Sequence, residues 1–431
     1  MKPDWESGIR GRLYALGRRA VPLAWRRALR RRVRTERLFG LRKPPVELDG
    51  RELDPGLPRP GRADVVVLPV IAWSYRRQRP QQLAEALARR GRRVFYGSLL
   101  GTGEPEQASG VAPGVTLLPI AGVRREDPAD RRLDGPALAA ALEGLGAARA
   151  RFGLAEAVVL VESPFWAPLA AALRERFGWR IAYDCLDAHE AFSTNRPRIL
   201  EDAERALASS ADLVVATSEA LRIRMAAWNP AARLLPNACD YALFAGVPPP
   251  APRPGRLAVG YVGAVDAWFD VGLLADLAAL RPDWTFEIVG GVEDVALAVP
   301  TLPNVAFRGE RPFREMPACR ARFDVEIIPF RLSALTHATD PVKLYEAAAA
   351  GRGVVATPMD SLAPFARRGL VRLAATAEDF AREIAAAASE GAAGVRRLRE
   401  FARENTWDLR AAALDGWLTA VGDRDTVNRE P

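Results

Sequence analysis

The sequence predicts an α/β protein with two Rossmann-like domains, each built on a doubly wound parallel sheet, and a basic helical tail in front of them. Along most of its 431 residues, short apolar runs typical of buried strands alternate with helical segments. This alternation is the pattern of parallel sheets that carry helices on both faces. A proline-rich stretch interrupts it once, and basic residues gather at the N-terminus. Two such domains should face each other across a cleft at the strand ends.

The tail is predicted over residues 1–60. Residues 1–45 hold 14 Lys/Arg and three acidic residues, so the rest of the chain is net −3 although the whole chain is +8. Trp, Leu and Val alternate with these arginines at nearly helical spacing, as in basic amphipathic helices that lie on anionic lipid. A flexible, solvated arm is the alternative. Because no nucleic-acid-binding module follows, the expected partner is an anionic membrane surface and not nucleic acid.

The first domain is predicted over residues 61–246. Its strands are expected where Val, Ile and Leu run together, and its helices where apolar residues recur every three or four positions. Ser218 is expected to cap one of these helices, because a serine side chain accepts from free N–H groups of the first turn. The predicted strands are 64–70, 94–96, 115–120, 157–161, 180–184, 212–216 and 233–235, and the predicted helices are 78–90, 136–151, 165–176, 199–209 and 218–227.

Residues 247–256 are predicted to be an interdomain linker, because five prolines in nine residues exclude both helix and central strand. The second domain is predicted over 257–405. A last helix and tail, 406–431, would pack back on the first domain. Strands of the second domain are expected at 257–262, 285–289, 305–308, 325–328, 354–356 and 370–373, and helices at 271–280, 313–321, 341–350 and 377–388.

The counts of cysteine and histidine restrict the chemistry. Cys185, Cys239 and Cys319 lie far apart without a C-x-x-C pair, which argues against a disulfide framework and a structural zinc site. His189 and His337 are the two histidines of the sequence, so a His-rich metal site is excluded. No apolar run approaches the ~18–20 residues of a membrane span, and acidic residues precede any apolar core at the N-terminus. We therefore expect a cytoplasmic protein without a bound metal.

The stretch 336–359, THATDPVKLYEAAAAGRGVVATPM, is the most informative part of the sequence. Pro341 suits the first turn of a helix with Asp340 as its cap, and Gly351 ends that helix before the strand GVVAT. A helix N-terminus offers free N–H groups and positive potential to an anion. Lys343 and Glu346 lie on one face of this helix. Only three of the 61 basic residues are lysines, which favours a specific role for Lys343, although a surface Lys–Glu pair is the alternative.

This stretch resembles the donor-site motif of nucleotide-sugar glycosyltransferases of the GT-B fold. Within this fold family, the sequence looks closer to the group 1 enzymes that make bacterial surface polysaccharides, such as teichuronic-acid and glucuronosyltransferase-like proteins, than to many retaining members. Further segments match in the same order, and the resemblance covers about residues 62–390. These segments are ADLVVATSEAL, LLPNACDYALF, RLAVGYVGAVDAWFD, LPNVAFRGE and FDVEIIPF.

The resemblance implies roles for residues of the second domain. Glu346 would hold the ribose hydroxyls, since a carboxylate accepts two hydrogen bonds. Lys343 would neutralise the diphosphate, and Gly263 would let the backbone approach it closely. His337 and Asp340, just before the helix, are assigned to the same donor site. The donor would be UDP- or GDP-linked, and neither a cofactor nor a metal ion is expected.

The candidate catalytic residues follow the strand 180–184 of the first domain. Many retaining relatives carry a glutamate where this chain has Ala338, which argues against a retaining reaction, and an inverting reaction would need one general base. Asp187 is the first choice for that base, and His189 is an alternative base or a sugar ligand. Asp184 is assigned to acceptor binding. The alternative is that these residues cap the next helix and pair with arginines.

The loop 73–81, WSYRRQRPQ, is expected to meet the acceptor. Arg76 and Arg79 could grip an anionic acceptor, such as a lipid pyrophosphate or a uronic acid, through paired hydrogen bonds. A solvated helix start is the alternative.

The predicted function is a metal-independent, hexosyl-type transfer. The sugar would pass from a nucleotide-sugar donor to a lipid-linked or saccharide acceptor, in bacterial cell-surface polysaccharide biosynthesis at the inner face of the cell membrane. A nucleotide-sugar epimerase of the same fold and a non-catalytic glycan- or lipid-binding scaffold are the alternatives. A dehydrogenase is disfavoured, because no G-x-G-x-x-G follows the first strand.

Overall fold

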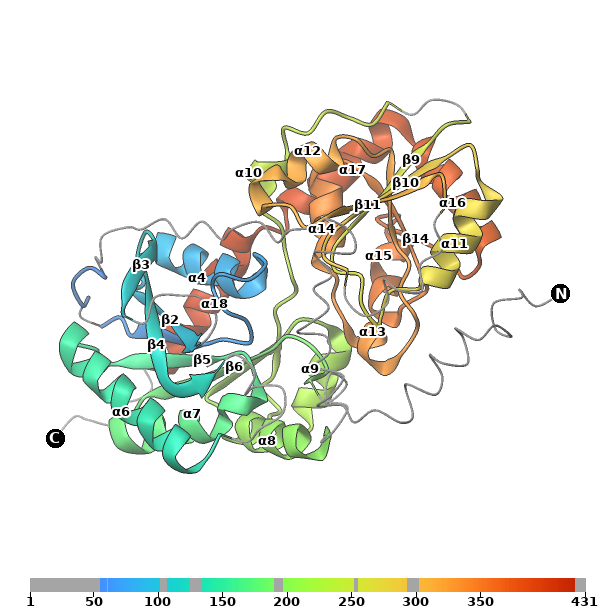
Figure 1. Cartoon of the computed structure of the whole chain (residues 1–431). Coiled ribbons are helices and arrows are strands. Elements are labelled where there is room, and N and C mark those ends of the chain that lie inside the picture. Colours follow the sequence, from blue (N-terminus) through green and yellow to red (C-terminus); the bar gives the residue numbers. More distant parts are fainter. Residues whose placement is uncertain are drawn as a thin grey trace.

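The computed structural model describes residues 55–59, 61–100, 107–124, 133–189, 197–251, 255–292 and 302–422. They form two α/β domains, one blue to green and the other yellow to orange in Figure 1. The predicted fold of two parallel-sheet domains is confirmed. Residues 1–45, which carry the predicted membrane contact, lie outside the described residues.

The first domain is built on an eight-stranded sheet of order β3-β4-β2-β1-β5-β6-β7-β8. All its pairings are parallel except that of β3 with β4, an edge hairpin that the sequence pattern did not predict. The order runs outward from β1 in both directions, so the switch point lies between β1 and β5, where ligands of such sheets bind. The strands are β1 Asp64–Leu68, β2 Val94–Leu100, β3 Ser109–Ala112, β4 Val115–Arg124, β5 Ala157–Val161, β6 Arg180–Cys185, β7 Leu213–Ala216 and β8 Arg233–Leu234.

Helices cover both faces of this sheet, which explains its continuous apolar strands. Val65 and Val67 of β1 belong to one buried cluster, while Val66 and Leu68 belong to another on the opposite face. Ser218 caps α9 as predicted, with its hydroxyl accepting from the Leu221 N–H at 3.3 Å. The helices are α4 Arg79–Arg89, α6 Gly135–Phe152, α7 Ala167–Phe177, α8 Pro197–Ser210 and α9 Glu219–Ala226.

The second domain is built on a six-stranded, all-parallel sheet of order β11-β10-β9-β12-β13-β14. Its switch point lies between β9 and β12. The strands are β9 Ala258–Val262, β10 Thr285–Val289, β11 Val305–Gly309, β12 Val325–Ile328, β13 Gly353–Ala356 and β14 Arg372–Leu373. The helices are α11 Val271–Leu280, α12 Met316–Arg320, α13 Ala334–Ala338, α14 Val342–Ala349, α15 Ala363–Arg367, α16 Ala377–Ala388 and α17 Gly391–Arg403.

The chain crosses between the domains twice, and the two crossings are hydrogen-bonded to each other. The first precedes the short helix α10, Tyr241–Phe244, which contacts α14 of the second domain, and the second leads into α18, Trp407–Gly422. The Cys239 N–H donates to the Asn405 carbonyl at 3.1 Å, and the Trp407 N–H donates to the Cys239 carbonyl at 3.3 Å. Helix α18 then packs against α4 of the first domain, red beside blue in Figure 1.

Candidate functional site

Helix α14 places the Lys343 side chain against the glycine turn that follows β9. Its Nζ lies 4.7 Å from the ring centroid of Phe330 and 5.5 Å from that of Tyr261. Burial lowers the pKa of Lys343 to about 8, while nearby Glu346 acts in the opposite direction. A lysine with this pKa is mostly protonated at neutral pH but sensitive to mild alkali. The site therefore holds a titratable cation at a helix N-terminus.

The start of α14 differs from the prediction. Pro341 is the residue before the first turn, the helix begins at Val342, and no side chain caps it. The Asp340 carboxylate instead accepts the Asn237 N–H at 2.6 Å and the Tyr345 hydroxyl at 3.1 Å. Burial raises the pKa of Asp340 to about 6, which these hydrogen bonds oppose. Asp340 thus joins the second domain to Asn237 in the first domain's last segment.

Glu346 is held by an arginine that the sequence analysis did not identify. Arg320 of α12 is fully buried, and its guanidinium donates to Glu346 Oε2 at 2.6 Å and also pairs with Glu326 of β12. Burial raises the pKa of Glu346, and Arg320 opposes that shift. Among the described residues, only Oε2 of Glu346 has a recorded hydrogen bond. Oε1 is therefore the oxygen that can accept from a ligand hydroxyl.

Glycines form the backbone beside Lys343. Gly263 after β9 and Gly290 after β10 have φ of +148° and +150°, a region that residues with a Cβ rarely adopt. A Cβ on Gly263 would lie 3.0 Å from Lys343 Cε, and one on Gly290 would lie 1.9 Å from the Gly263 carbonyl oxygen. The backbone at Gly263 has no room for a side chain, in line with the expected close approach, and the same is true at Gly290.

Asp187 lies where the first domain meets the loop before α14. The Thr339 hydroxyl donates to its Oδ1 at 3.4 Å. Burial raises the pKa of Asp187 to about 7, against which the hydrogen bond from Thr339 and the charge of Lys343 act. A carboxyl group with this pKa can take up a proton near neutral pH. The candidate base thus lies within electrostatic reach of the cation on α14. His189, two residues further on, is buried.

Arg79 and Asp184 form a buried pair and not an open grip for an acceptor. Arg79 Nε and Nη2 each donate to one Asp184 oxygen at 2.9 Å, and Nη1 donates to the Pro236 carbonyl at 3.2 Å. The two residues are 2% and 0% exposed, respectively, so a ligand does not reach them directly. Their assignment to acceptor binding is replaced by a structural role in which α4 is fixed to β6. Next to them, burial and the charge of Asp184 raise the pKa of Glu162 well above its usual range.

Arg76 reaches the second domain, unlike its neighbour. Its Nε pairs with Glu310, the residue after β11. Arg77 turns back to its own domain and pairs with Glu85 of α4 at 2.5 Å. The loop between β1 and α4 therefore contacts the donor-side domain directly.

The short helix α13 positions His337 and Ala338. His337 Nδ1 lies 3.2 Å from the Asp360 backbone nitrogen and 3.1 Å from the Asp360 carboxylate. Ala338, at the position where many retaining relatives have a glutamate, packs with Leu335 against a buried cluster of the first domain. α13 is thus part of the contact between the domains.

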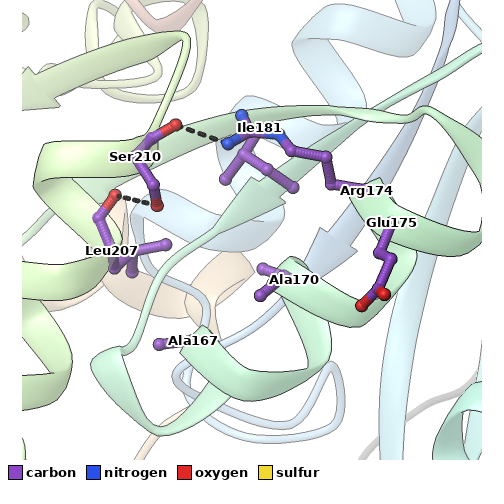
Figure 2. A pocket seen from close by; sticks show the side chains of 8 residues that line it. Ala167, Ala170, Arg174, Glu175, Ile181, Leu207 and Ser210 are labelled. Atoms are coloured by element: carbon purple, nitrogen blue, oxygen red, sulfur yellow. Dashed lines mark hydrogen bonds between the residues drawn. The ribbon is translucent and has the colours of Figure 1, made fainter.

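A shallow hollow on the first domain lies outside this set of residues. Figure 2 shows that α7, β6 and α8 form it, with alanines and Ile181 on its walls and Arg174 donating to the Ser210 carbonyl at 2.6 Å. None of the predicted site residues lines it. We do not assign it a ligand.

The sequence analysis did not identify three residues of the site, and the sequence carries a signal for two of them. Glu310 follows a strand directly and could have been noted as a strand-end carboxylate. Thr339 is next to the recognised motif. Arg320 carries no local signal, because its partners Glu326 and Glu346 are defined only by the fold.

Three further features of the described residues concern cysteines, metal sites and membrane spans. Cys185, Cys239 and Cys319 are buried and free. Within the described ranges, no cluster of three or more His, Cys, Asp or Glu side chains has the geometry of a metal site. No described helix is long and apolar enough to cross a membrane.

Family models match both domains of the chain. Residues 76–238 match the glycosyl transferase 4-like domain, and residues 256–390 match the glycosyl transferases group 1. The second match contains Lys343, Glu346 and Gly263.

Individual proteins show the same similarity. The chain is 28% identical over 216 residues to TuaH of Bacillus subtilis, which is assigned to teichuronic acid biosynthesis as a glycosyltransferase. That match covers 45% of this chain and 54% of the relative, or about half the relative's length. Sucrose-phosphate synthase from Thermosynechococcus elongatus has a TM-score of 0.64 at 18% identity, over 82% of this chain and 98% of that one. HepE from Anabaena, solved with UDP and glucose, has a TM-score of 0.61 at 15% identity, over 83% and 100%.

Proposed function

Because the chain belongs to the glycosyltransferases of the GT-B fold, we propose that it transfers a hexosyl group from a nucleoside diphosphate donor to a saccharide or lipid-linked acceptor. The observation that carries this proposal is the grouping of Lys343, Glu346 and Gly263 at the carboxyl edge of the second sheet. A cation at a helix N-terminus and a backbone turn without side chains suit a diphosphate. A carboxylate oxygen suits a ribose hydroxyl.

The donor is placed on the second domain. Glu346 Oε1 accepts from a ribose hydroxyl, while Arg320 holds the other oxygen at 2.6 Å. Lys343 and the N–H groups of α14 bind the diphosphate and stabilise the charge that develops on it as the sugar leaves. His337 faces the sugar from α13. In this proposal these groups neutralise the leaving diphosphate.

The reaction inverts the configuration at the anomeric carbon. An acceptor hydroxyl oxygen attacks that carbon and loses its proton to the Asp187 carboxylate, while the bond from carbon to phosphate oxygen breaks and its electrons leave with the nucleoside diphosphate. The raised pKa of Asp187, about 7, supports its use as a base near neutral pH. The alanine at position 338 agrees with this choice, because the glutamate of many retaining relatives is missing.

The acceptor belongs to bacterial cell-surface polysaccharide assembly. The similarity to TuaH supports this assignment. An acceptor of this kind is presented at the inner membrane face, where the basic residues 1–45 would hold the enzyme by their charge. The enzyme then works as a cytoplasmic protein attached peripherally.

The test is nucleoside diphosphate release from radiolabelled UDP- and GDP-sugars, with and without a lipid-linked saccharide extract. Acceptor-dependent release together with a labelled product supports the proposal. Isomerisation of the donor sugar without acceptor identifies an epimerase. Donor binding with no turnover under any acceptor identifies a scaffold.

A further inference from the structure

An arginine of the first domain contacts the second domain on the side where the diphosphate is proposed to bind. Arg76 belongs to the loop between β1 and α4, and its partner Glu310 is 234 positions further along the chain. The side chains of the pair are 25% and 13% exposed, so both are accessible to a ligand but largely enclosed. This ion pair is separate from the two places where the chain crosses between the domains.

Arg76 and Lys343 come from two domains and lie at two adjacent glycine turns, which follow β10 and β9, respectively. A Cβ on Gly263 would lie 3.3 Å from Lys343 Nζ. A Cβ on Gly291 would lie 2.3 Å from Arg76 Nη2. Gly290 links the two positions, because a Cβ there would lie 1.9 Å from the Gly263 carbonyl oxygen. The two cations therefore lie beside two glycine turns that touch each other.

Tyr261 lies near both cations, and this observation is independent of the glycines. Burial raises the pKa of Tyr261, and the charge of Arg76 opposes that shift. The ring of the same tyrosine lies 5.5 Å from Lys343 Nζ. Two positive groups so placed repel each other unless an anion lies between them. A ligand with at least two negative charges suits this arrangement.

We propose that Arg76 is a diphosphate-binding residue of the donor site, supplied by the first domain and pre-positioned by Glu310. The inference rests on the proposed function and moves Arg76 from the acceptor to the donor. Glu310 engages Nε, whereas a guanidinium carries four further N–H donors on its two terminal nitrogens. The arginine can therefore bind phosphate oxygens without releasing the carboxylate.

Donor binding then depends on both domains. Lys343 contributes from the second domain and Arg76 from the first, so a nucleoside diphosphate favours the arrangement in which the domains are together. A nucleoside without phosphates contacts only the second domain and is insensitive to Arg76. This difference between the two ligands separates phosphate binding from a general effect on folding.

The experiment compares the full-length protein with its Arg76→Gln, Glu310→Gln and Arg89→Gln variants by calorimetric titration. The ligands are UDP and GDP, with uridine, guanosine and inorganic pyrophosphate as controls. Arg89 is the matched control, because it also makes a long-range ion pair, with Asp408 at 2.7 Å, on the far end of α4. Arg76→Gln should weaken diphosphate and pyrophosphate binding at least about tenfold, the scale of one hydrogen bond to a charged group, and leave nucleoside binding unchanged. Arg89→Gln should have no effect.

The Glu310→Gln variant separates phosphate binding from a simple bridge between domains. If Arg76 binds phosphate, Glu310→Gln loses clearly less affinity for pyrophosphate than Arg76→Gln, because the guanidinium is still present although Glu310 no longer positions it. Equal losses in Arg76→Gln and Glu310→Gln would show that the pair acts only as a bridge and would overturn the inference, as would unchanged diphosphate affinity in Arg76→Gln. If the unaltered protein binds neither diphosphate, the proposed function fails first.

Discussion

Replacing Lys343 by methionine tests whether this ammonium group binds the donor diphosphate. Methionine keeps the length of the side chain beside Tyr261 and Phe330 and removes its charge. Losing one hydrogen bond to a charged group costs about 1.5–3 kcal/mol, so Lys343→Met should raise the dissociation constant of the nucleoside diphosphate roughly 10- to 150-fold at pH 7.

The pH dependence gives a sharper form of the same prediction. Because burial lowers the pKa of Lys343 to about 8, its protonated fraction falls from about nine-tenths at pH 7 to about one-tenth at pH 9. A diphosphate binds the protonated form, so its dissociation constant should rise about tenfold over this interval. The phosphate groups add little to the change, since their second pKa is about 6.

Titration calorimetry at half-unit steps from pH 7 to pH 9.5 measures this slope. The methionine variant should bind weakly at every pH, without the alkaline loss. Asp187, with a pKa raised to about 7, completes most of its titration below pH 8 in the unaltered protein. Because the charge of Lys343 holds that pKa down, Asp187 titrates at higher pH in the variant. Both proteins are therefore compared in an Asp187→Asn background, which isolates the lysine. An equal alkaline loss in Lys343→Met would refute the assignment of the slope to Lys343.

Three further changes test other parts of the account. Asp187→Asn should lower the turnover number by a factor of ~10²–10⁴, the usual contribution of a general base, with donor affinity unchanged; in the unaltered enzyme kcat should rise with pH through about 7. Near-normal turnover in steady-state assays would exclude Asp187 as the base. Gly290→Ala should lower both the melting temperature and diphosphate affinity, because its Cβ would meet the Gly263 carbonyl oxygen at 1.9 Å, whereas Gly246→Ala, with open space around it, is the control. A melting temperature equal to that of the control would contradict the close approach. Deleting residues 1–45 should abolish sedimentation with anionic vesicles at low salt and leave donor affinity intact, and equal sedimentation of both proteins would refute the charge-based contact.

The fold was predictable where strands are buried on both faces. DVVVL and AVVLV are continuous apolar runs because β1 and β5 lie in the middle of a sheet that carries helices on each side. The edge strand β3 was missed, since Ser109–Ala112 is short and has little apolar periodicity. Helix α17, Gly391–Arg403, was also missed, because two glycines near its start read as a loop.

The site was predictable only as far as local spacing determines it. Lys343 and Glu346 share a helix face, so their common orientation follows from the helical repeat alone. Arg79 and Asp184 were assigned to acceptor binding because Arg79 lies at the start of a helix and Asp184 at the end of a strand. Their pairing across 105 positions is a property of the packed domain, to which no local pattern points. The bond of Asp340 to Asn237, 103 positions away, was unpredictable for the same reason.

The contacts between the domains are of two kinds, and their difference indicates how the site opens. Asp340 and Asn237 are buried and joined by two bonds of 2.6 Å beside the chain crossings, so separating them leaves buried polar groups unpaired at a cost of about 1–3 kcal/mol each. Arg76 and Glu310 form a partly exposed ion pair, which typically contributes no more than about 1 kcal/mol. Asp187 is joined to the second domain by one bond of 3.4 Å. The weaker contacts should therefore break first, while the contact between Asp340 and Asn237 stays intact. They are also the contacts made by the proposed base and the proposed phosphate-binding arginine, so opening the domains would separate both groups from the donor at once.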